Sequence, residues 1–259
     1  MSIPATTFNA VMLATYGYFT YNSCKKNSEE TRVENSTKID ATNNPLYAYC
    51  LENVRHTMKP LTGNEYTISL CFNDHRKVPI TIPAVQIVSS KEIVINYQLY
   101  IIDQQACRFL VRSKINYQEW KENHPLKRLL LLSTNQVAIG IFAYYKNFSF
   151  LKTVALTSLI NIPLLVISEK SQPKKLDSKI LEQSTDQELL GGRRFFNVLL
   201  YNYQSQPIRS QLRKCVEEIS QLIRVRNIYS NPRIEREKED LLNEYLRPFC
   251  NKIVKLEFI

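Results

Sequence analysis

LLLLSTNQVAIGIFAYYKNFSFLKTVALTSLINIPLLVI, residues 129–167, constrains the fold more than any other part of the sequence. This stretch contains two lysines and no acidic residue. The connector Lys146-Asn147 divides it into lobes 129–145 and 148–167, each close to the length of about 20 residues that spans a bilayer. Because the connector is so short, we predict an antiparallel hairpin of two transmembrane helices.

Basic residues flank the apolar stretch on both sides, and they are Lys127, Arg128, Lys170, Lys174 and Lys175. Only Lys146 and Lys152 lie near the connector. By the positive-inside rule, both large flanks would then face the cytosol. We therefore expect a membrane protein that contacts the lipid bilayer through residues 129–167.

Polar residues within the same stretch support an alternative. Residues 133–136 read STNQ, and the second lobe contains Lys152, Asn161 and Pro163. Polar side chains inside a membrane span cost free energy unless they face a partner helix. The alternative is a soluble, cytoplasmic α+β protein with a buried strand at 137–145, a core helix at 148–161 and a second strand at 163–168.

In layout, the chain resembles the inclusion-membrane proteins of chlamydia-like intracellular bacteria. Those proteins carry a bilobed apolar domain, with both flanks facing the host cytosol and with helical tails. The resemblance covers residues 129–167 and, loosely, the helical tail. It implies a membrane-anchored protein without enzymatic activity that presents both flanks to the cytosol, and it assigns no functional residue.

The remainder of the chain divides by composition and periodicity. We expect an apolar N-terminal segment at 1–21, a polar linker at 22–44, a β-rich domain at 45–120 that begins with a short helix at 45–56, and a helical tail at 168–259. Apolar residues alternate with polar ones at 66–72, 93–101 and 109–111, as in half-buried strands. The fold class expected is α+β, with a small antiparallel unit of four or five strands, an apolar helical hairpin and a C-terminal helical region.

The tail is expected to contain helices at 184–190, 195–203, 207–228 and 232–252. One face of the third helix is apolar and carries Leu212, Val216, Ile219, Leu222 and Ile223. These spacings place the five side chains on one side of a helix, where they could pack on the core or bind a protein partner. We expect a protein partner to bind through these C-terminal helices.

The net charge of +10 does not favour nucleic acid as a partner. The excess is spread as +4, +2 and +4 over residues 1–128, 129–167 and 168–259, whereas nucleic-acid proteins usually concentrate it in a stripe or arm. Gly191-Gly192-Arg193-Arg194 lacks the spacing of a phosphate-binding loop. We interpret these glycines as a helix stop, with a phosphate-binding nest as the alternative.

No pattern of residues predicts a catalytic, cofactor or metal site. The six cysteines and three histidines are scattered, without the paired short spacings that zinc sites use. A nucleophilic cysteine would need a nearby histidine in space, and this enzymatic role belongs to the soluble alternative. The favoured function is a membrane-anchored, non-enzymatic interaction protein.

Overall fold

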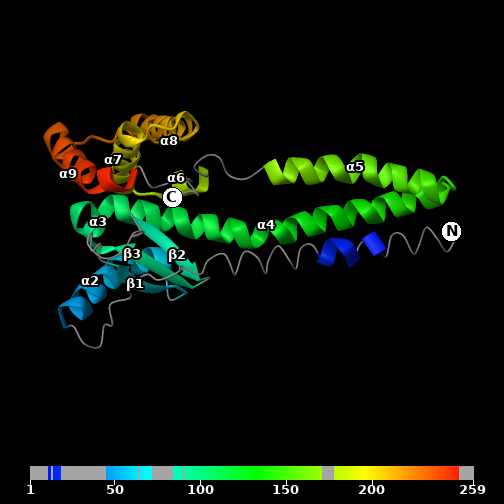
Figure 1. Cartoon of the computed structure of the whole chain (residues 1–259), viewed down its shortest axis with the longest axis horizontal. Coiled ribbons are helices and arrows are strands. Elements are labelled where there is room, and N and C mark those ends of the chain that lie inside the picture. The colour runs from blue at the N-terminus through cyan, green and yellow to red at the C-terminus, as the bar shows by residue number, and fades with distance from the viewer. Residues whose placement is uncertain are drawn as a thin grey trace. The chain divides into compact units, whose positions relative to one another are not determined.

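The computed structural model describes residues 11–12, 14–18, 45–63, 65–71, 84–89, 91–170 and 178–250. The chain forms two compact units, whose elements are labelled in Figure 1. The hairpin unit comprises Met1–Glu30 and Glu119–Gln172, and the sheet unit comprises Thr31–Gln118 and Pro173–Ile259. The finer division into five parts that we expected from the sequence stays a prediction.

A mixed sheet of three strands lies in the described part of the sheet unit. The strands are β1 (Thr67–Cys71), β2 (Val85–Ser89) and β3 (Glu92–Asn96), in the order β1-β3-β2. The central strand β3 pairs in parallel with β1 and antiparallel with β2. The coarse α+β class is therefore confirmed, but the prediction of an antiparallel unit of four or five strands is wrong for the described residues.

Two capping side chains explain why the predicted strands after β3 are helices. Asn96 accepts hydrogen bonds from two backbone N–H groups in the first turn of α3 (Tyr97–Ile102). Asp103 does the same for α4 (Gln104–Tyr145) through its Oδ1 atom. Because a cap satisfies N–H groups that a helix leaves unpaired, it favours a helix start. The alternating residues at 97–101 and 109–111 therefore lie on helices, where Leu99, Phe109 and Val111 are buried and Ile101 is 65% exposed.

Helix α2 (Pro45–Thr62) confirms the predicted helix at 45–56 and extends beyond it. Val54 and Met58 are completely buried on one face of α2. The hydroxyl of Tyr47 accepts a hydrogen bond of 3.2 Å from the backbone N–H of Leu70 in β1. This contact ties α2 to the sheet.

Four helices complete the sheet unit, and they are α6 (Ser178–Gln183), α7 (Asp186–Asn202), α8 (Gln206–Val225) and α9 (Pro232–Cys250). Helix α7 packs against both α8 and α9, and Figure 1 shows these three helices together on one side of α3 and the start of α4. Leu189, Phe195 and Phe196 of α7 are buried in the main core. The central position of α7 explains why ten of its 17 residues are buried.

Gly191 and Gly192 lie within α7, so the predicted helix stop at these glycines is wrong. A Cβ atom at Gly191 would collide with the backbone of Ala106 in α4. A Cβ atom at Gly192 would lie 2.8 Å from the ring of Phe109. The two glycines therefore let α7 approach α4 closely, and they do not end the helix.

The hairpin unit contains the second part of α4 and all of α5 (Phe150–Lys170). Asn147, in the connection between them, has a φ of 51°, a left-handed conformation that asparagine tolerates better than most residues and that commonly ends helices. The prediction of two helices joined at Lys146-Asn147 is confirmed. The two strands that the alternative placed at 137–145 and 163–168 are wrong, because both segments are helical, whereas its helix at 148–161 corresponds to the first part of α5.

The prediction that this hairpin is transmembrane is wrong. Among the residues that the structure describes, no helix is long and apolar enough to cross a membrane. Polar residues lie within both helices, at residues 133–136 in α4 and at Lys152 and Asn161 in α5, and polar side chains inside a membrane span cost free energy. The membrane-anchored function, the membrane localisation and the implied likeness to inclusion-membrane proteins lose their basis with it.

We expect Gly191→Ala to lower the free energy of unfolding by about 1–3 kcal/mol, the cost of overpacking a close contact. Urea titration followed by circular dichroism measures this change. Gly17→Ala is the matched control, because Gly17 is also helical but its added Cβ would meet open space. Equal destabilisation by the two substitutions would contradict the close approach of α7 to α4.

Candidate interaction surface

A buried ion pair joins α4 to α7. Nε of Arg194 donates to Oδ2 of Asp103 at 2.7 Å, and the two side chains are 2% and 0% exposed. Nη1 of Arg194 also donates to Glu235 of α9 at 2.6 Å. Burial by itself lowers the pKa of Arg194, but the hydrogen bonds and charges of Asp103 and Glu235 outweigh it and raise the pKa above its ordinary value. Arg194 is therefore a fixed cation whose described partners are carboxylates, which disfavours the phosphate-binding nest.

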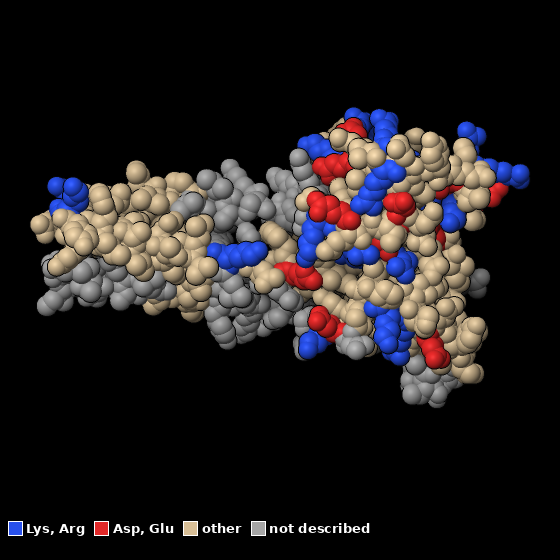
Figure 2. Space-filling model, turned by 180° about the vertical axis from the view of Figure 1, so that it is seen from behind, with Lys and Arg blue, Asp and Glu red and all other residues tan. Residues whose placement is uncertain are grey.

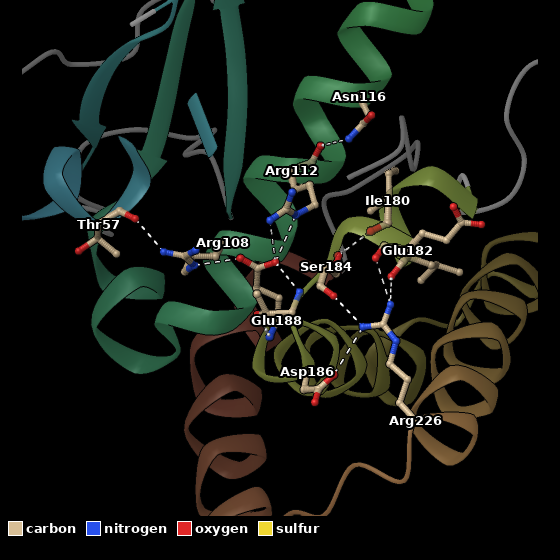
Figure 3. A network of polar contacts seen from close by, with 12 residues as sticks. Thr57, Arg108, Arg112, Asn116, Ile180, Glu182, Ser184, Asp186, Glu188 and Arg226 are labelled. Atoms are coloured by element: carbon tan, nitrogen blue, oxygen red, sulfur yellow. Dashed lines mark hydrogen bonds and ion pairs between the residues drawn. The ribbon is translucent and has the colours of Figure 1, made fainter. Parts of the chain in front are cut away.

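Glu188 is the centre of a second buried network, which Figure 3 shows. Its carboxylate accepts hydrogen bonds from Arg108 at 3.0 Å and from Nη2 of Arg112, also at 3.0 Å. It also accepts from the backbone N–H of Thr185, and it completes a capping box at the start of α7. Arg108 donates in addition to the backbone oxygen of Thr57 in α2. The network holds α2, α4 and α7 together, and its groups are paired with one another.

Arg226, which follows α8, binds the end of α6. Its guanidinium donates to the backbone oxygens of Leu181, Glu182 and Ser184, at distances of 2.9 to 3.2 Å. The last carbonyl groups of a helix have no partner within the helix, and an arginine there satisfies them. Figure 3 shows Arg226 pointing into this corner. Arg226 therefore has a structural role in the sheet unit.

The described cysteines do not have the environment of a nucleophile. Cys50, Cys71, Cys107 and Cys215 are all buried. Burial raises the pKa of Cys71 to about 12 and also raises the pKa of Cys107, whereas a nucleophilic thiol needs a lowered pKa. His56 is exposed, while His75 and the side chain of His124 lie outside the described residues. No group of three or more potential metal ligands occurs among the described residues.

The side chains of α8 that we predicted to bind a partner lie in the main core. Leu212, Ile219 and Ile223 are buried, and Val216 and Leu222 pack against the same core while partly exposed. A partner could reach the three buried side chains only by displacing the chain's own core. Binding of a protein through the C-terminal helices has not been tested and stays a prediction.

The predicted flanking basic residues are only partly described. Lys127 is exposed, and the side chains of Arg128 and Lys170 lie outside the described residues, as do Lys174 and Lys175 entirely. Their role as markers of the cytosolic side of a span is untested, and no described helix is long and apolar enough to cross a membrane. Contact of residues 129–167 with a lipid bilayer also stays untested.

The inside of the hairpin unit contains polar side chains beside apolar ones. Asn161 of α5 donates through Nδ2 to the hydroxyl of Tyr16 at 2.7 Å and to Oε1 of Gln136 in α4 at 3.3 Å. All three side chains are buried, as are Thr153 and Thr157, which precede Asn161 on the same side of α5. A hydrogen bond between buried amides is geometrically specific, so it fixes which faces of α4 and α5 meet.

The outside of the hairpin unit carries many large apolar side chains. In α4 and α5, ten of them are at least 40% exposed, and they are Leu130, Leu131, Val137, Ile141, Phe142, Tyr144, Tyr145, Phe150, Leu151 and Leu159. Figure 2 shows little blue and no red over most of the hairpin surface on the face in view, whereas both colours are mixed over the sheet unit. Large exposed apolar patches mark surfaces that another molecule covers. This surface is therefore the strongest candidate for a functional site.

The apolar segment at 129–167 is evident in the sequence, but the membrane environment predicted for it is wrong. Apolar residues are so dense in 129–145 that no helical periodicity stands out. High hydropathy therefore indicated a membrane-spanning lobe. The positions of two polar residues were more informative, because Gln136 and Asn161 lie on the inner faces of the two helices. That assignment needs the pairing of α4 with α5, which the sequence alone does not provide.

Comparison with protein-family models finds no match, and comparisons with curated proteins and with solved structures find none either. The candidate site therefore rests on its geometry.

Arg194→Leu is expected to lower the free energy of unfolding by about 3–5 kcal/mol, because it leaves the buried carboxylate of Asp103 without its cation. Chemical denaturation measures the loss. Arg233→Ala is the control, since the Arg233–Glu237 pair is 3.1 Å long but 87% and 63% exposed, and exposed pairs contribute about 0–1 kcal/mol. A loss for Arg194→Leu no larger than the control's would contradict a buried, energetically important pair.

Native Cys71 is expected to react very slowly with iodoacetamide at pH 8, because only the thiolate reacts and burial raises the pKa of Cys71 to about 12. The rate should increase as the pH rises towards that value. In urea the pKa returns to about 8.5, and the reaction should become fast. Mass spectrometry of the peptide that contains Cys71 measures both rates. Fast alkylation of the native protein at pH 8 would instead identify an activated thiol.

Proposed function

We propose that this chain is a protein-binding adaptor whose α4–α5 hairpin presents an apolar face to a protein partner. The observation that carries the proposal is the exposure of large apolar side chains on the hairpin, together with the burial of polar ones inside it. Gln136 and Asn161 are buried and hydrogen-bonded to each other, while side chains such as Leu130 and Leu151 are at least 70% exposed.

The energetics favour a covered surface. Burying a leucine-sized side chain that was in contact with water stabilises a complex by about 1.5–3 kcal/mol before the entropic costs of binding. A surface with ten such exposed side chains can therefore support specific association. Tyr144 and Tyr145 add aromatic residues, which are enriched in protein interfaces.

The sheet unit serves as the folded base of the adaptor. Helix α4 begins at Gln104, directly after Asp103, inside that unit and continues into the hairpin unit. The pairs of Asp103 with Arg194 and of Glu188 with Arg108 hold the first turns of α4 in the core. The charged groups of both networks are therefore paired within the sheet unit.

A photo-crosslinking residue tests the proposal in the cell where the chain is native. With p-benzoylphenylalanine in place of Ile141, ultraviolet light is expected to produce covalent adducts with a protein. The same residue in place of Tyr201 is the control, because Tyr201 is 84% exposed on α7 of the sheet unit. No adduct at position 141, or equal amounts of adduct at both positions, would contradict the proposal.

A further inference from the structure

We infer that the partner binds as an amphipathic helix with acidic flanks, along one defined stripe of α4. The inference rests on the proposed function and specifies the occupant of its site. The stripe, called the outer seam, consists of Leu130, Thr134, Val137, Ile141 and Tyr144. Spacings of four, three, four and three residues separate these positions, as in the heptad repeat by which helices pack on helices.

The outer seam lies opposite the face of α4 that is already packed. Leu132, Gln136, Ile139 and Ala143 are buried and form an inner seam, which includes the hydrogen bond of Gln136 with Asn161. Leu130, Thr134, Val137 and Ile141 each precede an inner position by two residues, and a helix turns by about 200° over that interval. Tyr144 continues the spacing of the outer seam three residues after Ile141. Helix α4 therefore has two heptad seams on opposite sides, and the outer one is exposed.

The outer seam is suited to burial along its whole length. Its four large side chains are between 53% and 70% exposed. Thr134, the one polar member, donates its hydroxyl to the backbone oxygen of Leu130 at 2.8 Å, so burying it would leave no unpaired donor. The outward face of α5 is less suitable, because its exposed positions 151, 155 and 159 repeat every four residues and include a small alanine.

The charges near the outer seam specify the chemistry of the partner helix. Lys127 precedes Leu130 by three residues and therefore continues the same stripe, whereas Lys146 follows the last residue of α4 and is near the seam in sequence only. Both lysines are exposed. Residues 129–167 contain no aspartate or glutamate, so an acidic partner meets attraction at the Lys127 end of the seam and no repulsion from acidic residues along it.

The same charges disfavour a second copy of this chain as the occupant. Two outer seams packed together would bring lysines from both copies into one interface without any acidic residue from the seam to pair with them. Like charges across an interface oppose association. A helix with leucines on its apolar face and glutamates beside them satisfies both the heptad spacing and the charge.

Two designed peptides test the inference by fluorescence anisotropy with the full chain. Each peptide has about three heptads with leucine at the core positions, and the flanking positions are glutamate in one and lysine in the other. We expect the glutamate peptide to bind at least about tenfold more tightly than the lysine peptide. Val137→Glu should weaken its binding by at least about tenfold, while Leu159→Glu on the outward face of α5 should change it less than about twofold.

Tyr144→Glu is a second seam variant, in case Val137→Glu impairs folding, and its expected effect is the same. Equal affinity for both peptides, or an equal effect of Leu159→Glu, would overturn the inference. So would a dimer of the chain in light scattering that Val137→Glu dissociates, or sedimentation of the chain with phosphatidylserine vesicles that Val137→Glu abolishes. If position 141 still crosslinks to a protein while the peptides do not discriminate, the adaptor function stands and only the acidic helix is excluded.

Discussion

The carboxylate of Asp103 both caps the start of α4 and binds α7 to it. One oxygen caps the first turn of α4, and the other accepts a hydrogen bond from the buried guanidinium of Arg194 in α7. The start of the long helix and the position of the central helix of the α7–α9 group are thus set by one side chain. Because both charged groups are buried, the loss of either one leaves the other without a counter-charge in a medium of low polarity.

Glycine and charge act together at the same contact between α4 and α7. The absent side chain of Gly191 lets the backbones approach beside Ala106, and Glu188, three residues earlier, binds Arg108 and Arg112 on α4. A close backbone approach and a buried ionic network are both intolerant of small displacements. Both contacts therefore fix the position of the beginning of α4 against α7.

Periodicity in the sequence predicted the elements whose local signals agree with their packing. Helix α2, strand β3 and the hairpin connection at Lys146-Asn147 are of this kind. Alternation failed after β3, since Asn96 and Asp103 cap helices there and apolar residues at 97–111 satisfy a helical face equally well. The parallel pairing of β1 with β3 depends on contacts between distant residues, which no local pattern encodes. The glycine pair was misinterpreted because its reason lies in another helix, at Ala106 and Phe109.

The environment of the hairpin was the hardest feature to predict from the sequence, because a dense apolar segment is compatible with several environments. Its inner polar contacts, Asn161 with Gln136 and Tyr16, place the apolar residues on the outside, and this arrangement converts a hydropathy signal into a candidate protein-binding surface. The heptad spacing of the outer seam was present in the sequence. The burial of the inner seam shows that this spacing lies on the exposed face of α4.

Accessibility of the outer seam in a native extract and in the purified chain tests the central claim most directly. Val137→Cys is labelled with a maleimide in both samples, and Thr157→Cys, at a buried position of α5, reports on the integrity of the hairpin. We expect the thiol at position 137 to react readily with the maleimide in the purified chain and to be protected in the extract. The thiol at position 157 should be protected in both samples. Equally fast labelling of position 137 in the two samples would contradict a partner on this surface.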